Sequence, residues 1–218
     1  MSAVACSWLG RQDYATALEK QQDLVALVAS GKSGEQLLLL EHDPVFTIGR
    51  TRDLSSLRRA DELPYPVVET NRGGQATYHG PGQLVGYPIL HLGRRGRDLH
   101  AYLRFLEGFL ITVCSHWGIA ACRREGLTGV WVEDRKIASI GVGLRQWVSM
   151  HGFALNVGSD LAAFSCITPC GISGVVMTSI SRECGRELVP QEVAELCAET
   201  FSGALENGLP EKSGGARH

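Results

Sequence analysis

The stretch R-G-G-Q-A-T-Y-H-G-P-G-Q, residues 72–83, combines four glycines with side chains that can hold charge or move a proton. Glycine costs a folded chain more backbone entropy than any other residue, so this density needs a reason. One reason is a plain loop between two strands. The other is a binding loop, in which the missing side chains let a ligand lie against the backbone beside Arg72, Thr77, Tyr78 and His79. The phosphate-loop patterns G-x-x-x-x-G-K-[ST] and G-x-G-x-x-G are absent from the stretch.

A second candidate for chemistry is the cysteine in P-C-G-I at 169–172. Pro169 restricts the backbone before Cys170, and Gly171 allows a sharp turn after it. Such a setting can fix a thiol in space and aim nearby N–H groups at a developing oxyanion. An inert buried thiol and a pair with Cys166 remain the alternatives. Because a free thiol has a pKa of about 8.5, a nucleophilic Cys170 would need a nearby cation to raise its thiolate fraction.

Lys136 is the cation that we expect to fill this role. It follows Asp134 and Arg135, a predicted hairpin turn, and begins the apolar strand I-A-S-I-G-V. Adjacent residues of a strand point to opposite faces, so one of Arg135 and Lys136 can face solvent while the other faces a site. A solvated strand end is the alternative for Lys136.

The elements that must position these residues follow from hydrophobic spacing. Helical spacing predicts amphipathic helices over 12–29, ended by Gly31, over 98–116 with Asp98 as N-cap, and from Pro190 onwards. Alternating or apolar runs predict strands near 36–42, 45–49, 67–70 and 83–92, the last at an edge or bulge because of Pro88. A meander of three strands is predicted over 129–133, 136–144 and 147–157, and mostly loop over 50–66 and 158–188. Helices with mainly hairpin-connected strands indicate an α+β fold.

Composition narrows the class of protein. The chain has 218 residues, 44% of them apolar, and a net charge of -2, so neither nucleic acid nor a membrane is an expected partner. We expect one domain over residues 1–206 and a disordered tail over 207–218. The N-terminus lacks the pattern of a secretory signal, and the seven cysteines are scattered. Both features favour a cytoplasmic location.

The glycine-rich stretch, extended to R-G-G-Q-A-T-Y-H-G-P-G-Q-L-V-G-Y, resembles the signature of the octanoyltransferases of lipoate biosynthesis. Further blocks fit the same family in the same order. They are G-V-W-V-E-D-R-K-I-A-S-I-G-V at 129–142, H-G-F-A-L-N-V at 151–157, I-T-P-C-G-I at 167–172 and T-S-I at 178–180. The resemblance covers nearly the whole chain except the extreme N-terminus and the tail. It implies a mixed or antiparallel sheet with flanking helices, similar to the catalytic domain of biotin and lipoate-protein ligases.

The ligases that share this fold also carry a glycine-rich loop and a lysine in a later hairpin. Their loop looks like S-G-G-G-A-V-Y-H-D-x-G-N, whereas this chain has two consecutive glycines and G-P-G-Q after His79. A ligase activates its acid with ATP and needs no nucleophilic cysteine, whereas this chain has Cys170 where the transferases keep theirs. An ATP-dependent lipoate-protein ligase is the alternative function. A non-catalytic acyl-binding or thiol-redox module is a third.

The resemblance implies that Cys170 is the acyl-thioester nucleophile, and that Lys136 lowers its pKa and acts as acid and base. The expected enzyme, an acyltransferase, moves an octanoyl or lipoyl group from acyl carrier protein to a specific lysine of a lipoyl domain, the first step of endogenous lipoate attachment. The expected acceptors are the lipoyl domains of 2-oxoacid dehydrogenase E2 subunits and the glycine cleavage H protein. No ATP, metal or other cofactor is expected, because the donor carries phosphopantetheine and thioester-to-amide transfer is downhill.

The same resemblance places the acyl group against residues 72–79, 139–141 and 152–154. Glycines there leave room, and several of the other side chains are apolar. His79 would orient the acyl carbonyl or Lys136, unless it is bonded within its own loop. The expected substrate-binding residues are Arg72, Gly73, Gly74, Gln75, Ala76, Thr77, Tyr78, His79, Ser139, Ile140, Gly141, Gly152, Phe153 and Ala154.

Overall fold

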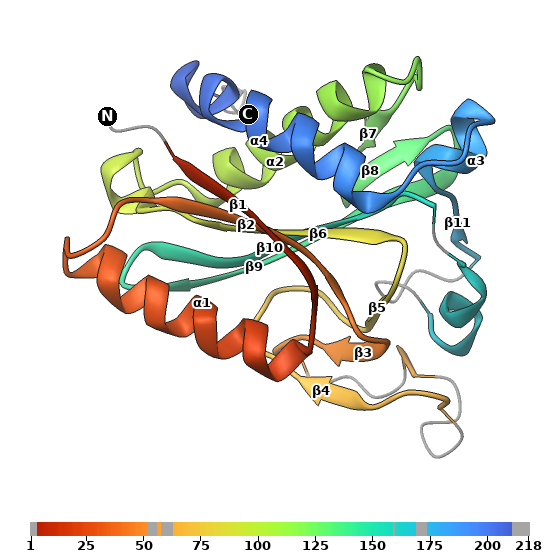
Figure 1. The fold of residues 1–218 in the computed structure, drawn as a ribbon, viewed down its shortest axis with the longest axis horizontal. Coiled ribbons are helices and arrows are strands. Elements are labelled where there is room, and N and C mark those ends of the chain that lie inside the picture. The colour runs from red at the N-terminus through yellow and green to blue at the C-terminus, as the bar shows by residue number, and fades with distance from the viewer. Residues whose placement is uncertain (1–3, 52–55, 58–62, 159, 169–173, 211–218) are drawn as a thin grey trace, which may run out of the picture.

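The computed structural model describes residues 4–51, 56–57, 63–158, 160–168 and 174–210. Within these residues the centre of the fold is a mixed sheet of eight strands (Figure 1). From edge to edge they are β1 (Ala5–Gln12), β2 (Gln36–His42), β6 (Gln83–Ile89), β10 (Val148–Asn156), β9 (Arg135–Arg145), β8 (Leu127–Val132) and β7 (Cys122–Arg124), with β11 (Val176–Met177) beside β9. The predicted meander is the β8–β9–β10 unit.

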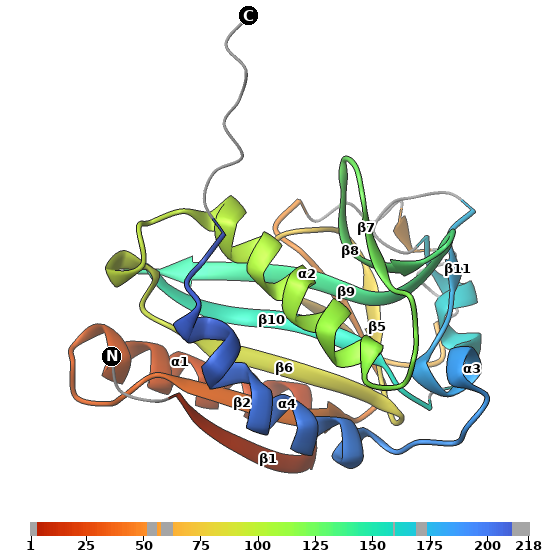
Figure 2. The ribbon, with the colours of Figure 1, turned by 90° about the horizontal axis from the view of Figure 1, so that it is seen from above.

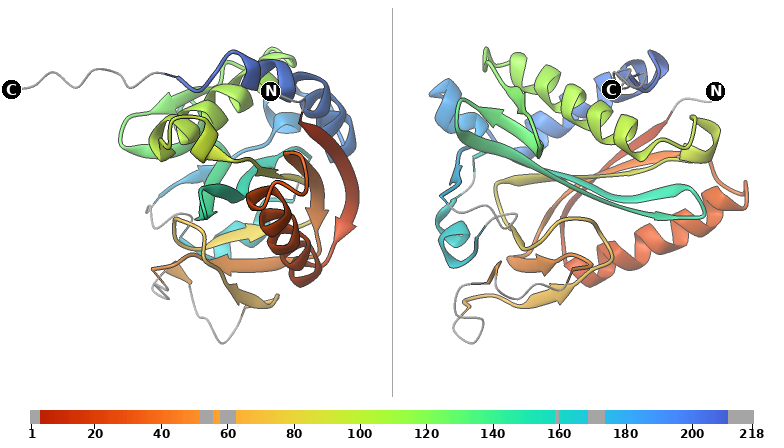
Figure 3. Two further views of the ribbon diagram at one scale, coloured as in Figure 1. Left: turned by 90° about the vertical axis from the view of Figure 1, so that its left-hand side faces the viewer. Right: turned by 180° about the vertical axis from the view of Figure 1, so that it is seen from behind.

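Helices cover both faces of this sheet. Helices α2 (Leu99–Ser115) and α4 (Pro190–Glu206) cross one face side by side (Figure 2). Helix α1 (Tyr14–Ala29) lies on the opposite face with a second, smaller sheet, as both views of Figure 3 show. The predicted α+β class, a mixed sheet with flanking helices, is confirmed.

Strand β2 shows why four consecutive leucines suit the middle layer. Leu37 and Leu39 belong to the core beneath α2 and α4, whereas Leu38 and Leu40 belong to the core above α1. Side chains alternate between faces with a period of two, so a strand covered on both faces must be apolar throughout. Burying each leucine contributes roughly 1.5–3 kcal/mol to stability.

The helices begin where the sequence predicts. The Asp98 carboxylate accepts the Ala101 N–H at 3.0 Å, which caps α2, and Pro190 occupies the first turn of α4. The apolar face of α2, including Leu106, Phe109 and Leu110, is buried. Shorter helical turns are η3 (Leu92–Arg94), η4 (Ala162–Cys166) and α3 (Ile180–Cys184).

The second sheet consists of β4 (Val67–Glu69), β3 (Val45–Ile48) and β5 (Thr77–His79). Strand β3 is its centre, parallel to β4 and antiparallel to β5. Phe46, Ile48, Ala76 and Tyr78 form its core with side chains of the 161–167 segment. The predicted strands at 45–49 and 67–70 therefore exist, but they belong to a sheet separate from that of β2.

Two features of the main sheet were not anticipated. Pro88 predicted an edge or a bulge, but strand β6 is an interior strand between β2 and β10, and its register against β2 runs unbroken through Pro88. The edge position is therefore wrong. The proline fits because the ladder to β10 is interrupted after Gly86 and resumes at Leu90, whose C=O accepts the Ser149 N–H at 2.9 Å. Within the gap the Ser149 hydroxyl donates to Pro88 O at 2.6 Å. The edge strand β1 has no counterpart among the predicted strands.

No helix in the described part of the chain is long and apolar enough to cross a membrane.

Candidate active site

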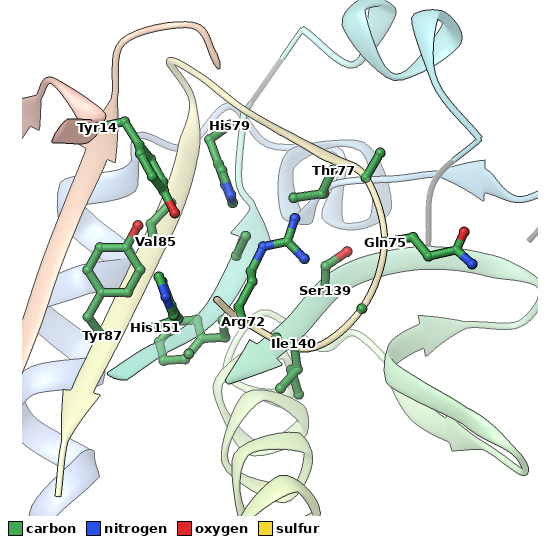
Figure 4. A pocket seen from close by; sticks show the side chains of 16 residues that line it. Tyr14, Arg72, Gln75, Thr77, His79, Val85, Tyr87, Ser139, Ile140 and His151 are labelled. Atoms are coloured by element: carbon green, nitrogen blue, oxygen red, sulfur yellow. The ribbon is translucent and has the colours of Figure 1, made fainter. Parts of the chain in front are cut away.

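A narrow pocket lies between the 72–79 stretch and strands β9 and β10 (Figure 4). The cavity volume is about 40 Å³. Apart from Gly73 and Tyr78, all the predicted substrate-binding residues line it. Four further residues complete its walls: Tyr14, Val85, Tyr87 and His151. The structure thus brings together three segments that are far apart in the sequence.

Missing side chains let the 72–79 stretch pack directly on β9. The Gly73 N–H donates to Val142 O at 2.9 Å. A Cβ on Gly141 would lie 2.9 Å from Gly73 O, so a side chain there would push the stretch away. Gly74 has a φ of 82°, a conformation that glycine adopts at little cost. The glycines therefore let the stretch lie close to β9 and form one wall of the pocket.

Arg72 carries the central positive charge of the pocket. Its guanidinium donates from Nη2 to Thr47 O at 2.8 Å and to Thr47 Oγ1 at 2.7 Å, and from Nη1 to Gly73 O at 3.0 Å. Figure 4 shows it reaching between Tyr14, Tyr87 and His151 on one side and Thr77 and Ser139 on the other. The side chain is 7% exposed, so its charge acts on the neighbouring groups with little screening.

His151 is held neutral beside this charge. Burial, and then the Arg72 charge, lower its pKa from 6.5 to about 4. Its Nε2 lies 2.7 Å from Asn71 Oδ1, which can only accept, so we assign the proton to Nε2. Its Nδ1 is then a buried acceptor, and it has no hydrogen-bond partner among the described residues. The φ of 55° at His151 is also unusual for a residue in a strand.

Tyr87 is anchored by a second neutral histidine. His42 Nδ1 lies 3.1 Å from Gln12 O, a pure acceptor, so the Tyr87 hydroxyl donates to His42 Nε2 at 2.6 Å. Burial lowers the pKa of His42 from 6.5 to about 4. Burial also raises the pKa of Tyr14 to about 12 and that of Tyr87 well above 10. This end of the pocket is therefore polar but uncharged apart from Arg72.

His79 is bonded within its own surroundings. Its Nδ1 lies 2.8 Å from Gln83 Oε1, and its Nε2 lies 3.4 Å from Thr47 Oγ1. Burial is the largest cause of a pKa well below 6.5, and its ring stacks on that of Tyr14. Because both ring nitrogens already have partners, these contacts support the structural alternative for His79, although the ring also lines the pocket.

Tyr78 points away from the pocket into the core of the small sheet. Its ring lies 5.5 Å from that of Phe46, 5.8 Å from that of Tyr65 and 5.6 Å from that of Phe164. Gly73 bonds to β9 without reaching the pocket wall. For these two predicted binding residues, the structure gives a packing role.

Lys136 is buried at the start of β9. It is 1% exposed, its Nζ donates to Thr128 O at 3.2 Å, and the Trp131 ring lies 5.3 Å away. Arg135 points to the other strand face and pairs with Glu183 at 2.9 Å and with Glu133 at 2.6 Å. Of the two cations, Lys136 is thus buried and Arg135 is partly exposed. That Lys136 faces the site stays a prediction. Cys170 lies outside the described residues.

The cysteines in the described part of the chain form no disulfide. Burial raises the pKa of Cys114 to about 12 and raises those of Cys6 and Cys197 as well. Such thiols are protonated at neutral pH and behave as small apolar side chains. Among the described residues no group of His, Cys, Asp and Glu side chains could hold a metal ion.

Comparison with known proteins supplies the family. The model of the lipoyl protein ligase A/B catalytic domain matches residues 13–202. An octanoyltransferase of Geobacter sulfurreducens is 53% identical over 204 residues, which cover 94% of this chain and 86% of that protein. The chain belongs to the octanoyltransferase family. A second octanoyltransferase, from Citrifermentans bemidjiense, is 54% identical over 197 residues, 90% of this chain and 95% of that protein. The chain is therefore an acyltransferase that transfers an octanoyl group, as the motifs predicted.

Solved structures show the same fold in more distant proteins. A bipartite lipoate protein ligase of Thermoplasma acidophilum matches with a TM-score of 0.72 at 17% identity, over 94% of this chain and 85% of that one. The biotin protein ligase of Aquifex aeolicus, in complex with biotin and ATP, matches with a TM-score of 0.60 at 13% identity, over 93% and 71%. At such identities the likeness concerns the fold alone. The octanoyltransferase thus has the ligase-like catalytic fold that the sequence motifs implied.

The pocket residues that sequence reasoning missed fall into two groups. His151 and Tyr87 are end residues of the quoted motifs H-G-F-A-L-N-V and R-G-G-Q-A-T-Y-H-G-P-G-Q-L-V-G-Y, so the motifs held the signal. Val85 lies inside the second of these motifs. Tyr14 comes from the start of α1, with no local motif, and only the packing of α1 beneath the sheet brings it to the pocket.

Proposed function

We propose that this octanoyltransferase works by double displacement through an octanoyl thioester on Cys170. The donor is octanoyl-acyl carrier protein and the acceptor is the ε-amine of a lysine in a lipoyl domain. The observation that carries the proposal is a buried lysine on the strand that also lines the pocket. Lys136 and the pocket residues Ser139, Ile140 and Gly141 all belong to β9.

The described parts of the chain on either side of Cys170 support the pairing of Cys170 with Lys136. On one side, Thr168 donates its N–H to Ser56 O at 2.7 Å. On the other, the chain from Gly174 enters β11, where Met177 pairs with Lys136 and Thr178 N–H donates to Lys136 O at 3.0 Å. The chain that leaves the cysteine segment is therefore registered against the lysine itself.

In the first displacement, the Cys170 thiolate attacks the thioester carbonyl and the phosphopantetheine sulfur leaves. The Lys136 ammonium stabilises the attacking thiolate and then gives a proton to the departing sulfur. In the second, the neutral acceptor amine attacks the acyl-enzyme and Lys136 takes the proton that the nitrogen must lose. An amide forms, the Cys170–acyl bond breaks, and the thiolate–ammonium pair is restored.

The pocket suits an alkyl chain. Val85, Ile140, Phe153 and Ala154 give it apolar walls, and the histidines at its far end are neutral. Ser139 lies three residues beyond Lys136, about 10 Å along the same strand. Each buried methylene contributes about 0.8 kcal/mol, so an octanoyl chain gains roughly 5 kcal/mol in total.

Partners and location follow from this chemistry. We infer that the acceptors are lipoyl domains of 2-oxoacid dehydrogenase E2 subunits and the glycine cleavage H protein, all reached in the cytoplasm. The Thermoplasma acidophilum ligase with the same fold belongs to a lipoylation system that includes an E2 lipoyl domain. A thioester donor needs neither ATP nor a metal, because its transfer to an amine is downhill.

The test offers a purified lipoyl domain two donors in separate reactions. Octanoyl-acyl carrier protein without ATP should add one octanoyl group to the domain, whereas octanoate with ATP and magnesium should add none. Mass spectrometry of the domain measures both. Acylation only with octanoate and ATP would show a ligase and contradict the proposal, and modification with neither donor would favour a non-catalytic module.

A further inference from the structure

A buried carboxylate on α2 faces the strand before Lys136. Glu107 is 1% exposed, because it lies on the buried side of α2 among side chains that are otherwise apolar or aromatic. Its Oε2 accepts from Arg104 Nη1 at 2.6 Å and from Arg123 Nε at 3.2 Å. Its Oε1 accepts the Gly129 N–H at 3.1 Å. A carboxylate is costly to bury, so this placement calls for a reason beyond packing.

The Gly129 N–H connects Glu107 to Lys136 through one peptide group. The carbonyl of that peptide is Thr128 O, which accepts the Lys136 Nζ–H at 3.2 Å. In a trans peptide the N–H and C=O point in opposite directions, so the carboxylate binds one end and the ammonium binds the other. Each charge polarises the peptide in the sense that strengthens the other hydrogen bond.

The local sequence fits this bridge, by which we mean the hydrogen bonds that join Glu107 to Lys136 through the Thr128–Gly129 peptide. Gly129 has a φ of 131°, and a Cβ there would lie 2.7 Å from Lys136 Cε and 2.7 Å from Ala138 O. The β8–β9 register shifts at this point, with Val130 opposite Ala138 but Trp131 opposite Lys136. Such bulges turn side chains at functional sites. Here the bulge sets the lysine between the Thr128 carbonyl and the Trp131 ring.

We propose that Glu107 is a positioning residue for Lys136: through the Thr128–Gly129 peptide it fixes the ammonium that the reaction requires. The inference rests on the proposed role of Lys136, and Glu107 itself touches no reacting atom. The other charges nearby are placed differently. Arg104 and Arg123 reach the carboxylate from its far side, Arg124 stacks on Trp131, and Glu183 pairs with Arg135.

The test compares Glu107→Leu, which has no acceptor for the Gly129 N–H, with Glu107→Gln, which keeps one. Cys170 alkylation by iodoacetamide is followed against pH by peptide mass spectrometry. Loss of the Glu107 negative charge alone would favour the Cys170 thiolate and lower the pH midpoint of its alkylation. Displacement of the Lys136 ammonium would instead raise that midpoint. The midpoint should therefore rise in Glu107→Leu, with a roughly threefold or greater drop in alkylation rate at pH 7, but not in Glu107→Gln.

A double variant and a matched control complete the design. In a Lys136→Met background, Glu107→Leu should produce no further rise in the midpoint, because the group it positions is gone. Glu35 gives the control, since it too is a mostly buried carboxylate that accepts a backbone N–H, from His91 at 2.8 Å, and an arginine, Arg95. Glu35→Leu should leave the midpoint unchanged.

A reciprocal measurement does not depend on the folding of any Glu107 variant. In Lys136→Met the Thr128 carbonyl loses its ammonium, so the Gly129 amide proton should exchange faster with solvent and shift upfield in an NMR spectrum. An unchanged Gly129 signal would overturn the bridge. So would a midpoint that falls or stays in Glu107→Leu, or that rises equally with and without Lys136. If Lys136→Met itself leaves the midpoint unchanged, the proposed role of the lysine fails, and with it the inference.

Discussion

The two ends of strand β9 handle buried polar groups in opposite ways. At the pocket end, His151 lies opposite Val142 of β9, its ring lies 6.3 Å from that of Tyr87, and the Tyr87 hydroxyl bonds to His42. These three side chains and Tyr14 are uncharged at neutral pH, so Arg72 is the one charged side chain among the described residues that line the pocket. At the other end, Lys136 shares its surroundings with charged groups, Glu107 with two arginines on one side and the Arg135–Glu183 pair on the other.

This difference matches what each end must do in octanoyl transfer. An alkyl chain gains most from walls without charge, since an isolated buried charge is costly and attracts water. A thiolate and a proton carrier instead need a charge that persists away from water, and ion pairs supply the compensation. In the proposed mechanism the pocket end holds the chain by burial and the lysine end acts by paired charge. Arg72 is the charged exception at the pocket end, where its guanidinium bonds to Thr47 and Gly73.

Removing the charge at the lysine end should have the largest effect. Lys136→Met keeps apolar volume but loses the ammonium, so turnover should fall by roughly 10²–10⁴-fold and the pH midpoint for Cys170 alkylation should rise. Lys136→Arg should restore part of the thiolate but little turnover, because a guanidinium does not give up its proton. Steady-state kinetics and alkylation rates measure both.

Arg145→Met is the suitable control for this substitution. Arg145 is an exposed cation at the far end of the same strand, so its loss should change turnover less than about twofold. Arg135 is a poor control, because it pairs with Glu183, whose carboxylate also accepts the Thr178 hydroxyl at 2.6 Å beside β11. Normal turnover in Lys136→Met would contradict the proposal that the lysine end of β9 acts through its charge.

Acid should destabilise the protein through the pocket end. The pKa values of His42 and His151 are about 4 in the folded protein against 6.5 ordinarily, so the unfolded chain takes up protons first as the pH falls. Stability is then full above about 6.5 and is lost from there down towards 4. Between pH 7 and 5.5 each histidine should cost about 1 kcal/mol.

Urea unfolding at the two pH values measures this loss. His42→Gln is the matched variant, because its amide can still donate to Gln12 O and accept from Tyr87, and it should reduce the pH dependence by about one proton. A free energy of unfolding that stays constant between pH 7 and 5.5 would mean that these histidines are not held neutral by burial.

The smallest effect is expected at a buried hydroxyl. Thr77 lines the pocket and is 6% exposed, and its Oγ1 has no hydrogen-bond partner among the described residues. Thr77→Val keeps the shape, so stability should stay equal or rise by up to about 1 kcal/mol. If the hydroxyl bonds to the donor, KM for octanoyl-acyl carrier protein should rise by about 3–10-fold. A clear loss of stability would show that the hydroxyl already has a partner in the free protein.

Local patterns predicted much of this fold. The apolar spacing of α1, α2 and α4 and the meander β8–β10 was legible because each element carries its own period and caps. Strand β1 was missed because its residues are mostly half-exposed or exposed at the sheet edge. Pro88 was misinterpreted because a local rule about edges cannot foresee that the Ser149 hydroxyl bonds to Pro88 O where the ladder to β10 is interrupted.

The candidate site shows the same division. The motifs named most of the pocket wall and both sides of the Lys136–Arg135 alternation. The role of Glu107 could not be predicted, because one acidic residue on an apolar helix face does not indicate which peptide group lies opposite it in the fold. The single domain over 1–206 and the disordered tail stay predictions, as do the roles of Cys170 and Lys136.

The central claim is an octanoyl thioester on Cys170. The most direct measurement is the intact mass of the enzyme after exposure to octanoyl-acyl carrier protein without an acceptor, with peptide mapping of the adduct. Wild type, Cys166→Ser and Cys184→Ser should each gain one octanoyl group on the peptide that contains Cys170, and Cys170→Ser should gain none and lose turnover. An adduct that persists in Cys170→Ser, or that disappears in Cys166→Ser, would contradict the account.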